Sequence, residues 1–128
     1  MTARIKTKME SILIVDDDIS LCTLLSEELK EVGYTTDFVT RADAAFEYLD
    51  KNHEVDIILL DLKLPGNDGF YILRKLKESE QNSKIIVLTA YADVKSAMDS
   101  SRLGADGFIG KPYDLDELII TIRSVLQQ

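Results

Sequence analysis

The sequence predicts an α/β fold, (βα)5, in which a doubly wound five-stranded parallel sheet carries helices on both faces. Two observations lead to it. Short apolar segments that suit buried strands alternate five times with segments whose apolar residues recur every three or four positions. Each strand-and-helix round takes roughly 20–25 residues, and alternation of this kind gives a parallel sheet joined by right-handed crossovers.

The first half of the chain supplies two strand–helix rounds. Residues 11–15 form a short apolar strand, and the helix that follows presents one apolar stripe before Gly33 ends it. Residues 34–39 have strand composition, and the apolar positions within residues 42–49 indicate the second helix. The residues of the stripe that we expect to be buried on the first helix are Leu21, Leu24, Leu25, Leu29 and Val32.

Three further rounds complete the predicted sheet. The strand over residues 56–60 contains an unbroken apolar run, which is typical of a strand buried on both faces, and residues 84–88 repeat the pattern. A loop through Pro65 and Gly66 follows the first of these strands, and residues 107–109 form the last strand. The three remaining helices lie around residues 70–76, 94–103 and 114–126, the last with Asp114 as its N-cap.

Length and composition indicate one soluble domain. No repeat or linker divides the 128 residues, so we expect a frayed basic lead-in over residues 1–9 and a single domain over residues 10–128. The net charge of −8 argues against direct contact with nucleic acid. The single cysteine, Cys22, excludes an internal disulfide, and no segment approaches the ~20 apolar residues of a membrane span. These features favour a cytoplasmic protein with no membrane contact.

Polar side chains follow four of the five predicted strands. Asp16 and Asp17 come directly after the first strand, Asp61 after the third, Thr89 after the fourth and Lys111 after the fifth. The second strand ends without obvious chemistry. Because ligands of parallel α/β sheets bind beyond the carboxyl ends of the strands, we expect these side chains to converge on one small pocket.

The predicted pocket has the composition of a phosphoryl-transfer site. Two carboxylates ~5 Å apart repel each other by roughly 3 kcal/mol at an effective dielectric of about 20, and Mg²⁺ would relieve that repulsion. Lys111 adds a positive charge, and Thr89 adds a hydroxyl group. Asp61, alone at the end of a central strand, is the natural nucleophile, because a carboxylate can accept a phosphoryl group as an acyl phosphate. Asp18 is expected to cap the first helix.

Four segments in order and spacing carry a family resemblance. ILIVDDD (residues 12–18), LLDLKLPGNDG (59–69), VLTAY (87–91) and GADGFIGKP (104–112) together resemble the receiver domain of bacterial two-component response regulators. The resemblance spans residues 11–126 and implies a flavodoxin-like strand order, 2-1-3-4-5. Within the family, the chain is similar to the receivers of phosphorelay intermediates and of enhancer-binding transcription activators.

The resemblance implies a role for each pocket residue. Asp61 would take a phosphoryl group from a phosphohistidine on a sensor histidine kinase or a histidine phosphotransfer protein. Asp17, Asp61 and the backbone carbonyl of Lys63 would bind Mg²⁺ directly, with Asp16 acting largely through water. Lys111, ahead of an expected cis peptide bond to Pro112, would bind a phosphoryl oxygen.

The resemblance also implies a switch. Thr89 would turn its hydroxyl onto the phosphate and Phe108 would follow as the aromatic switch residue, although an ordinary core role for Phe108 stays open. Lys63 and Tyr91 would flank the path of the hydrolytic water and slow dephosphorylation, unless both side chains point to solvent. Ile19, off the buried stripe, would either contribute to a kinase-docking surface or be an ordinary exposed residue.

The expected function is that of a phosphoacceptor signalling domain that catalyses only its own phosphorylation and dephosphorylation. It would control a partner or an output domain beyond the chain end, including by a homodimer that forms on phosphorylation. The alternative from another class is a phosphohydrolase with an aspartyl nucleophile. Against it, Lys63 stands where such an enzyme has a second acid, and no cap domain encloses a substrate. A binding-only pseudo-receiver would lack acids or the lysine, and all are present.

Overall fold

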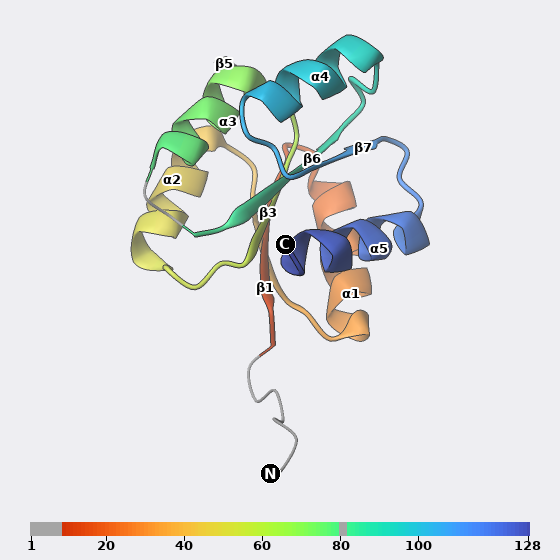
Figure 1. Ribbon diagram of the computed structural model, residues 1–128. Helices are drawn as coiled ribbons and strands as arrows, with labels where there is room; N and C mark the ends of the chain where they lie inside the picture. Colours follow the sequence, from red (N-terminus) through yellow and green to blue (C-terminus); the bar gives the residue numbers. More distant parts are fainter. Residues whose placement is uncertain (1–8, 80–81) are drawn as a thin grey trace.

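The computed structural model describes residues 9–79 and 82–128, so residues 1–8 of the expected lead-in lie outside it (Figure 1). Its main sheet has five parallel strands in the order β2-β1-β3-β6-β7, which is the predicted order 2-1-3-4-5. The fold prediction is therefore confirmed. The bounds of the strands in this sheet are Ser11–Val15 (β1), Thr35–Val39 (β2), Ile57–Leu60 (β3), Lys84–Thr89 (β6) and Gly107–Gly110 (β7).

Helices cover both faces of the sheet. Helices α1 and α5 lie side by side on one face, and α2 and α3 cover the other (Figure 1). Successive strand residues point to opposite faces, so each central strand contributes to two separate hydrophobic clusters. This explains why the central strands are continuous apolar runs. The helix bounds are Ile19–Val32 (α1), Ala42–Lys51 (α2), Gly69–Glu78 (α3), Val94–Arg102 (α4) and Leu115–Leu126 (α5).

The predicted helix ends are confirmed. Asp18 precedes α1, and its side chain accepts a hydrogen bond from the backbone N–H of Leu21 at 3.0 Å. Gly33 ends the same helix in the left-handed conformation, with φ of 119°. Asp114 accepts from Asp116 at the start of α5. These caps satisfy backbone donors that the first turn of a helix leaves free.

The buried stripe of α1 differs from the prediction at two positions. Leu25 and Leu29 are fully buried, but Leu24 is 55% exposed and Val32 is also exposed. Cys22, which the predicted stripe did not include, is fully buried. The buried line runs through residues 22, 25 and 29, and Leu24 lies about 100° around the helix from Leu25, outside the contact with the sheet.

A short hairpin replaces the loop expected after the third strand. Strands β4 (Lys63–Leu64) and β5 (Asn67–Asp68) pair antiparallel around Pro65 and Gly66, with Gly66 at φ of +73°. The hairpin returns the chain to the start of α3, where a Cβ on Gly69 would lie 2.2 Å from the carbonyl oxygen of Leu62. Only glycine fits this approach.

Among the described residues, no helix combines the length and apolar character needed to cross a bilayer.

The corrected α1 face predicts different costs for two adjacent leucines. Leu25→Ala should lower the free energy of unfolding by about 2–5 kcal/mol, because it leaves a cavity in the core. Leu24→Ala, the matched control, should cost less than about 1 kcal/mol, because that side chain is already largely in solvent. Urea unfolding monitored by circular dichroism measures both. Equal losses would contradict the orientation of α1.

Candidate functional site

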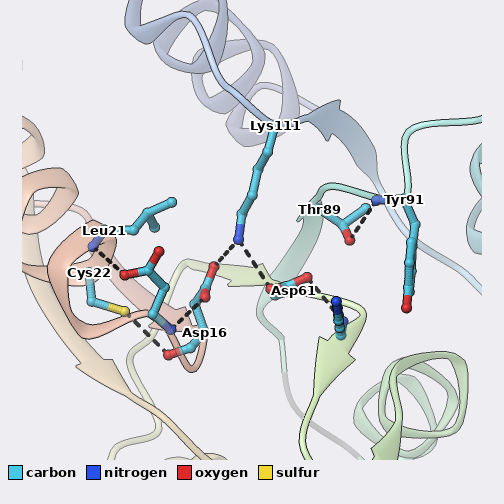
Figure 2. Close-up of polar contacts among 9 residues, drawn as sticks. Asp16, Leu21, Cys22, Asp61, Thr89, Tyr91 and Lys111 are labelled. Atoms are coloured by element: carbon cyan, nitrogen blue, oxygen red, sulfur yellow. Dashed lines mark hydrogen bonds and ion pairs between the residues drawn. The ribbon is translucent and has the colours of Figure 1, made fainter.

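Backbone hydrogen bonds bring the predicted site residues to one edge of the sheet. The N–H of Asp16 bonds the carbonyl of Val39 at 3.1 Å, and the N–H of Asp61 bonds the carbonyl of Val15 at 2.9 Å. The N–H of Lys111 bonds the carbonyl of Thr89 at 2.9 Å. Each bond continues the parallel ladder by one residue past a strand end. The side chains of Asp16, Asp61 and Lys111 are therefore held at the same level (Figure 2).

The ammonium group of Lys111 bridges two buried carboxylates. Its Nζ lies 2.6 Å from Oδ2 of Asp16 and 3.1 Å from Oδ2 of Asp61 (Figure 2). Asp16 is 2% exposed and Asp61 is 5% exposed. A buried charge that loses its partner costs about 3–5 kcal/mol, so these three groups depend on one another. The predicted convergence of Asp16, Asp61 and Lys111 is a fact of the structure.

The second oxygen of each buried carboxylate is also hydrogen-bonded. Oδ1 of Asp16 accepts from the N–H of Asp18, and Oδ1 of Asp61 accepts from the N–H of Lys63, both at 3.0 Å. The thiol of Cys22 donates to the carbonyl of Asp16 at 3.4 Å. Burial raises the pKa of Cys22 to about 12, which keeps this thiol protonated. These bonds fix the orientation of both carboxylates.

Sequence reasoning missed the contact of Cys22 with the site. The predicted stripe of the first helix did not include this residue, and the sequence assigned it no role in the site. Two signals were present: cysteine is among the most buried residue types, and residue 22 lies three positions before Leu25 and seven before Leu29.

The cluster keeps an excess of negative charge. Burial raises the pKa of Asp16, although the hydrogen bond from Lys111 opposes this effect. Burial also works to lower the pKa of Lys111, but the hydrogen bond and charge of Asp16, with the charge of Asp61, outweigh it and raise that pKa. Lys111 is therefore cationic at neutral pH. One ammonium cannot balance three carboxylates, because Asp17 lies beside the other two.

The donor set suits a hard divalent cation. Oxygen atoms of Asp16, Asp17 and Asp61 all lie within 4.8 Å of one another. Asp17 is exposed, so the cluster is open to water on that side. Mg²⁺ prefers one or two carboxylates together with water and phosphate oxygens, and these residues fit that preference.

Thr89 and its neighbours form the other side of the site. Thr89 is fully buried, and its Oγ1 accepts a hydrogen bond from the N–H of Tyr91 at 3.2 Å (Figure 2). Tyr91 is 47% exposed, and Lys63 is exposed too. Each is thus tied through its backbone to a site residue two positions earlier, while its side chain stands outside the cluster. Phe108, at the middle of β7, is half-buried against the core cluster on the α2 and α3 face.

The remaining sequence expectations can be placed as well. The peptide bond between Lys111 and Pro112 is cis, as expected. Ile19 is exposed as the first residue of α1, beside the acidic loop. His53 is exposed in the connection between α2 and β3.

Comparisons with known proteins show which family the chain is similar to. The sequence model of the response regulator receiver domain matches residues 12–123. The chain is 36% identical over 117 residues to "Sporulation initiation phosphotransferase F" of Bacillus subtilis (strain 168), covering 91% of this chain and 94% of that protein. It is 33% identical over 121 residues to "Regulatory protein AtoC" of Escherichia coli (strain K12), covering 94% of this chain. That alignment takes in only 26% of the length of the second protein.

A solved structure gives the same result. The crystal structure of a putative response regulator from Chloroflexus aurantiacus J-10-fl superposes with a TM-score of 0.87 at 27% sequence identity, over 94% of this chain and 100% of the other. The family match covers most of the chain, and the acidic cluster lies at the carboxyl ends of the parallel strands. The chain belongs to the response regulator receiver domain family, whose members are phosphoacceptors of two-component signalling rather than classical enzymes.

Proposed function

We propose that Asp61 is the phosphoacceptor and takes its phosphoryl group from a phosphohistidine on a sensor histidine kinase or a histidine phosphotransfer protein. The observation that carries this proposal is the bridge from Lys111 to Asp16 and Asp61. It places a buried carboxylate beside an ammonium group and two further acids. Mg²⁺ would be held by Asp16, Asp17, Asp61 and the backbone carbonyl of Lys63.

The transfer needs little covalent chemistry from the protein. An oxygen of Asp61 attacks phosphorus, the bond from phosphorus to the histidine nitrogen breaks, and the imidazole leaves with that electron pair. Mg²⁺ supplies neutralisation of phosphoryl charge when bound. Lys111 turns from Asp16 to a phosphoryl oxygen, and the hydroxyl of Thr89 donates to another. The chain would catalyse only the formation and the hydrolysis of its own acyl phosphate.

The conformational signal would start at Thr89. Its Oγ1 accepts from Tyr91, so a turn of the hydroxyl toward the phosphate removes this bond and frees the segment before α4. Phe108 lies on the adjacent strand and would repack by contact alone, because it lacks a hydroxyl group. The face formed by α4, β7 and α5 would then differ between two states that phosphorylation biases.

The extent of the domain and what it controls are also proposed here. Residues 10–128 would form a single receiver domain whose changed face controls a partner protein, a homodimer or an output domain, including one that regulates transcription. The chain spans about a quarter of the length of the AtoC protein, so any output domain is inferred. A cytoplasmic location also stays a prediction. The phosphohydrolase alternative gains no support from the comparisons, and Lys63 remains where that mechanism needs an acid.

The phosphoacceptor role predicts a clear result with a small donor. Incubation with acetyl phosphate and Mg²⁺ should add one hydroxylamine-labile phosphoryl group to the parent chain and none to Asp61→Asn, as measured by intact-mass spectrometry. Asp68→Asn is the matched control, because Asp68 is an exposed helix cap in the same loop region and asparagine also caps well. Equal labelling of Asp61→Asn and the parent would contradict the proposal.

The metal proposal predicts a difference between two adjacent acids. Mg²⁺ should stabilise the parent by about 2.7 kcal/mol at a hundred times its dissociation constant. Asp17→Asn should weaken Mg²⁺ binding at least about tenfold, because it removes one carboxylate ligand from the cluster. Asp18→Asn, which keeps the α1 cap, should bind as the parent does. Urea unfolding across a Mg²⁺ titration measures all three, and unchanged affinity in Asp17→Asn would be evidence against this site.

The positions of Lys63 and Tyr91 predict a slowly decaying acyl phosphate. The backbone N–H groups of both residues bond the side chains of Asp61 and Thr89. Their own side chains would obstruct in-line attack by water, so Lys63→Asn and Tyr91→Ala should shorten its half-life several-fold. Tyr71→Ala is the control, because Tyr71 is also 47% exposed but lies on α3. The decay is followed after removal of the donor. Unchanged half-lives in both variants would end this part of the proposal.

A further inference from the structure

A second contact ties together the two segments that carry Asp16 and Lys111. The phenol of Tyr113, two residues after Lys111, donates a hydrogen bond to Oε1 of Glu28 at 2.5 Å. Glu28 lies on α1, the helix that follows the acidic loop, and Tyr113 directly precedes the N-cap of α5. The two partners are 85 residues apart in sequence, and helices α1 and α5 lie side by side in Figure 1.

Both partners are held in place by their surroundings. The ring of Tyr113 packs against the core cluster between the sheet and helices α1 and α5, and Glu28 is half-buried. Burial, followed by the hydrogen bond to Glu28, raises the pKa of Tyr113, so the phenol keeps its proton and donates. Hydrogen bonds to ionised acceptors are stronger than those between neutral groups. Both residues line a surface cavity of about 360 Å³ whose wall includes Lys111.

The contact lies outside the acidic cluster, and this separates it from the bridge made by Lys111. In the structure the ammonium of Lys111 is closest to Asp16, at 2.6 Å. The proposed transfer turns this ammonium toward a phosphoryl oxygen, which weakens the direct link between the two segments. The Tyr113–Glu28 bond uses neither Asp16 nor Asp61. Moving the Lys111 ammonium group therefore removes neither partner of this bond.

We propose that Tyr113 and Glu28 are positioning residues for phosphoryl transfer, whose hydrogen bond holds the segment after β7 against α1 so that Lys111 reaches the phosphoryl group on Asp61. The inference rests on the proposed function. The backbone of Lys111 is fixed on one side by its N–H bond to Thr89 at 2.9 Å. Tyr113 supplies the fixed point on the other side. The lysine side chain is long and flexible. Fixing the backbone on both sides of Lys111 therefore helps to keep its ammonium group oriented toward the phosphoryl group.

The test compares rate constants for phosphorylation of the full chain by acetyl phosphate with saturating Mg²⁺. Tyr113→Phe keeps the ring packing and removes only the hydroxyl, and it should lower the rate constant about tenfold. Glu28→Ala should lower it by the same factor, and the double variant should be no slower than either single variant. Glu28→Gln should retain at least about half of the parent rate, because its amide oxygen accepts the phenol hydrogen bond.

Two readouts separate positioning from a general loss of structure. Mg²⁺ affinity should be unchanged in all four variants, because no ligand of the cluster is altered. Tyr48→Phe is the matched control: Tyr48 makes the same kind of bond, to Asp37 at 2.6 Å, between α2 and β2, so its loss should leave the rate as in the parent. Parent-like rates in Tyr113→Phe and Glu28→Ala would overturn this inference and leave the proposed function standing. A parent chain that is not labelled on Asp61 would overturn the proposed function and the inference together.

Discussion

One ammonium group holds the functional edge of this sheet together. Lys111 pairs with Asp16 and Asp61, which lie 95 and 50 residues away in sequence and are almost completely buried. Carboxylates in such positions are costly unless a cation and hydrogen bonds compensate them. The compensation is only partial, because a single ammonium group faces two buried carboxylates and Asp17 adds a third acid to the cluster. The remaining negative charge would favour a divalent cation at this site.

The rest of the fold holds the three side chains of this contact in position. The parallel ladder continues one residue beyond each strand, so the site residues are positioned by backbone bonds that do not depend on their side chains. Hydrophobic clusters on both faces pack the central strands against their helices. Side chains at the edge can therefore exchange partners while the sheet stays fixed. A rigid support with a few movable polar groups is what a phosphorylation-dependent switch requires.

The sequence was sufficient for the fold and for the convergence of the site, because both follow from simple patterns. Unbroken apolar runs such as residues 57–60 mark strands buried on both faces, and polar residues directly after them must meet at one edge. The exposed face of α1 was predicted wrongly at Leu24, because a leucine-rich helix offers more apolar residues than its contact with the sheet can bury.

Contacts that depend on tertiary geometry could not be predicted from the sequence. The hairpin around Pro65 and Gly66 has only two residues in each strand, too few for a periodic signal. The bond between Tyr113 and Glu28 joins the segment before α5 to helix α1, and neither residue type indicates the other as its partner. The backbone donors to Asp16 and Asp61 likewise follow from the path of the loops. The contacts that orient the acidic cluster are therefore what the sequence did not predict.

The most direct test of the central contact is a double-mutant cycle in the free energy of unfolding, measured at neutral pH without divalent cations. Lys111→Met should lose about 3 kcal/mol, because it leaves two buried carboxylates without their cation. Adding Asp16→Asn to that variant should recover part of the loss, because one of the unpaired charges is then gone. A stability of Lys111→Met equal to that of the parent, or additive effects of the two substitutions, would contradict the role assigned to Lys111.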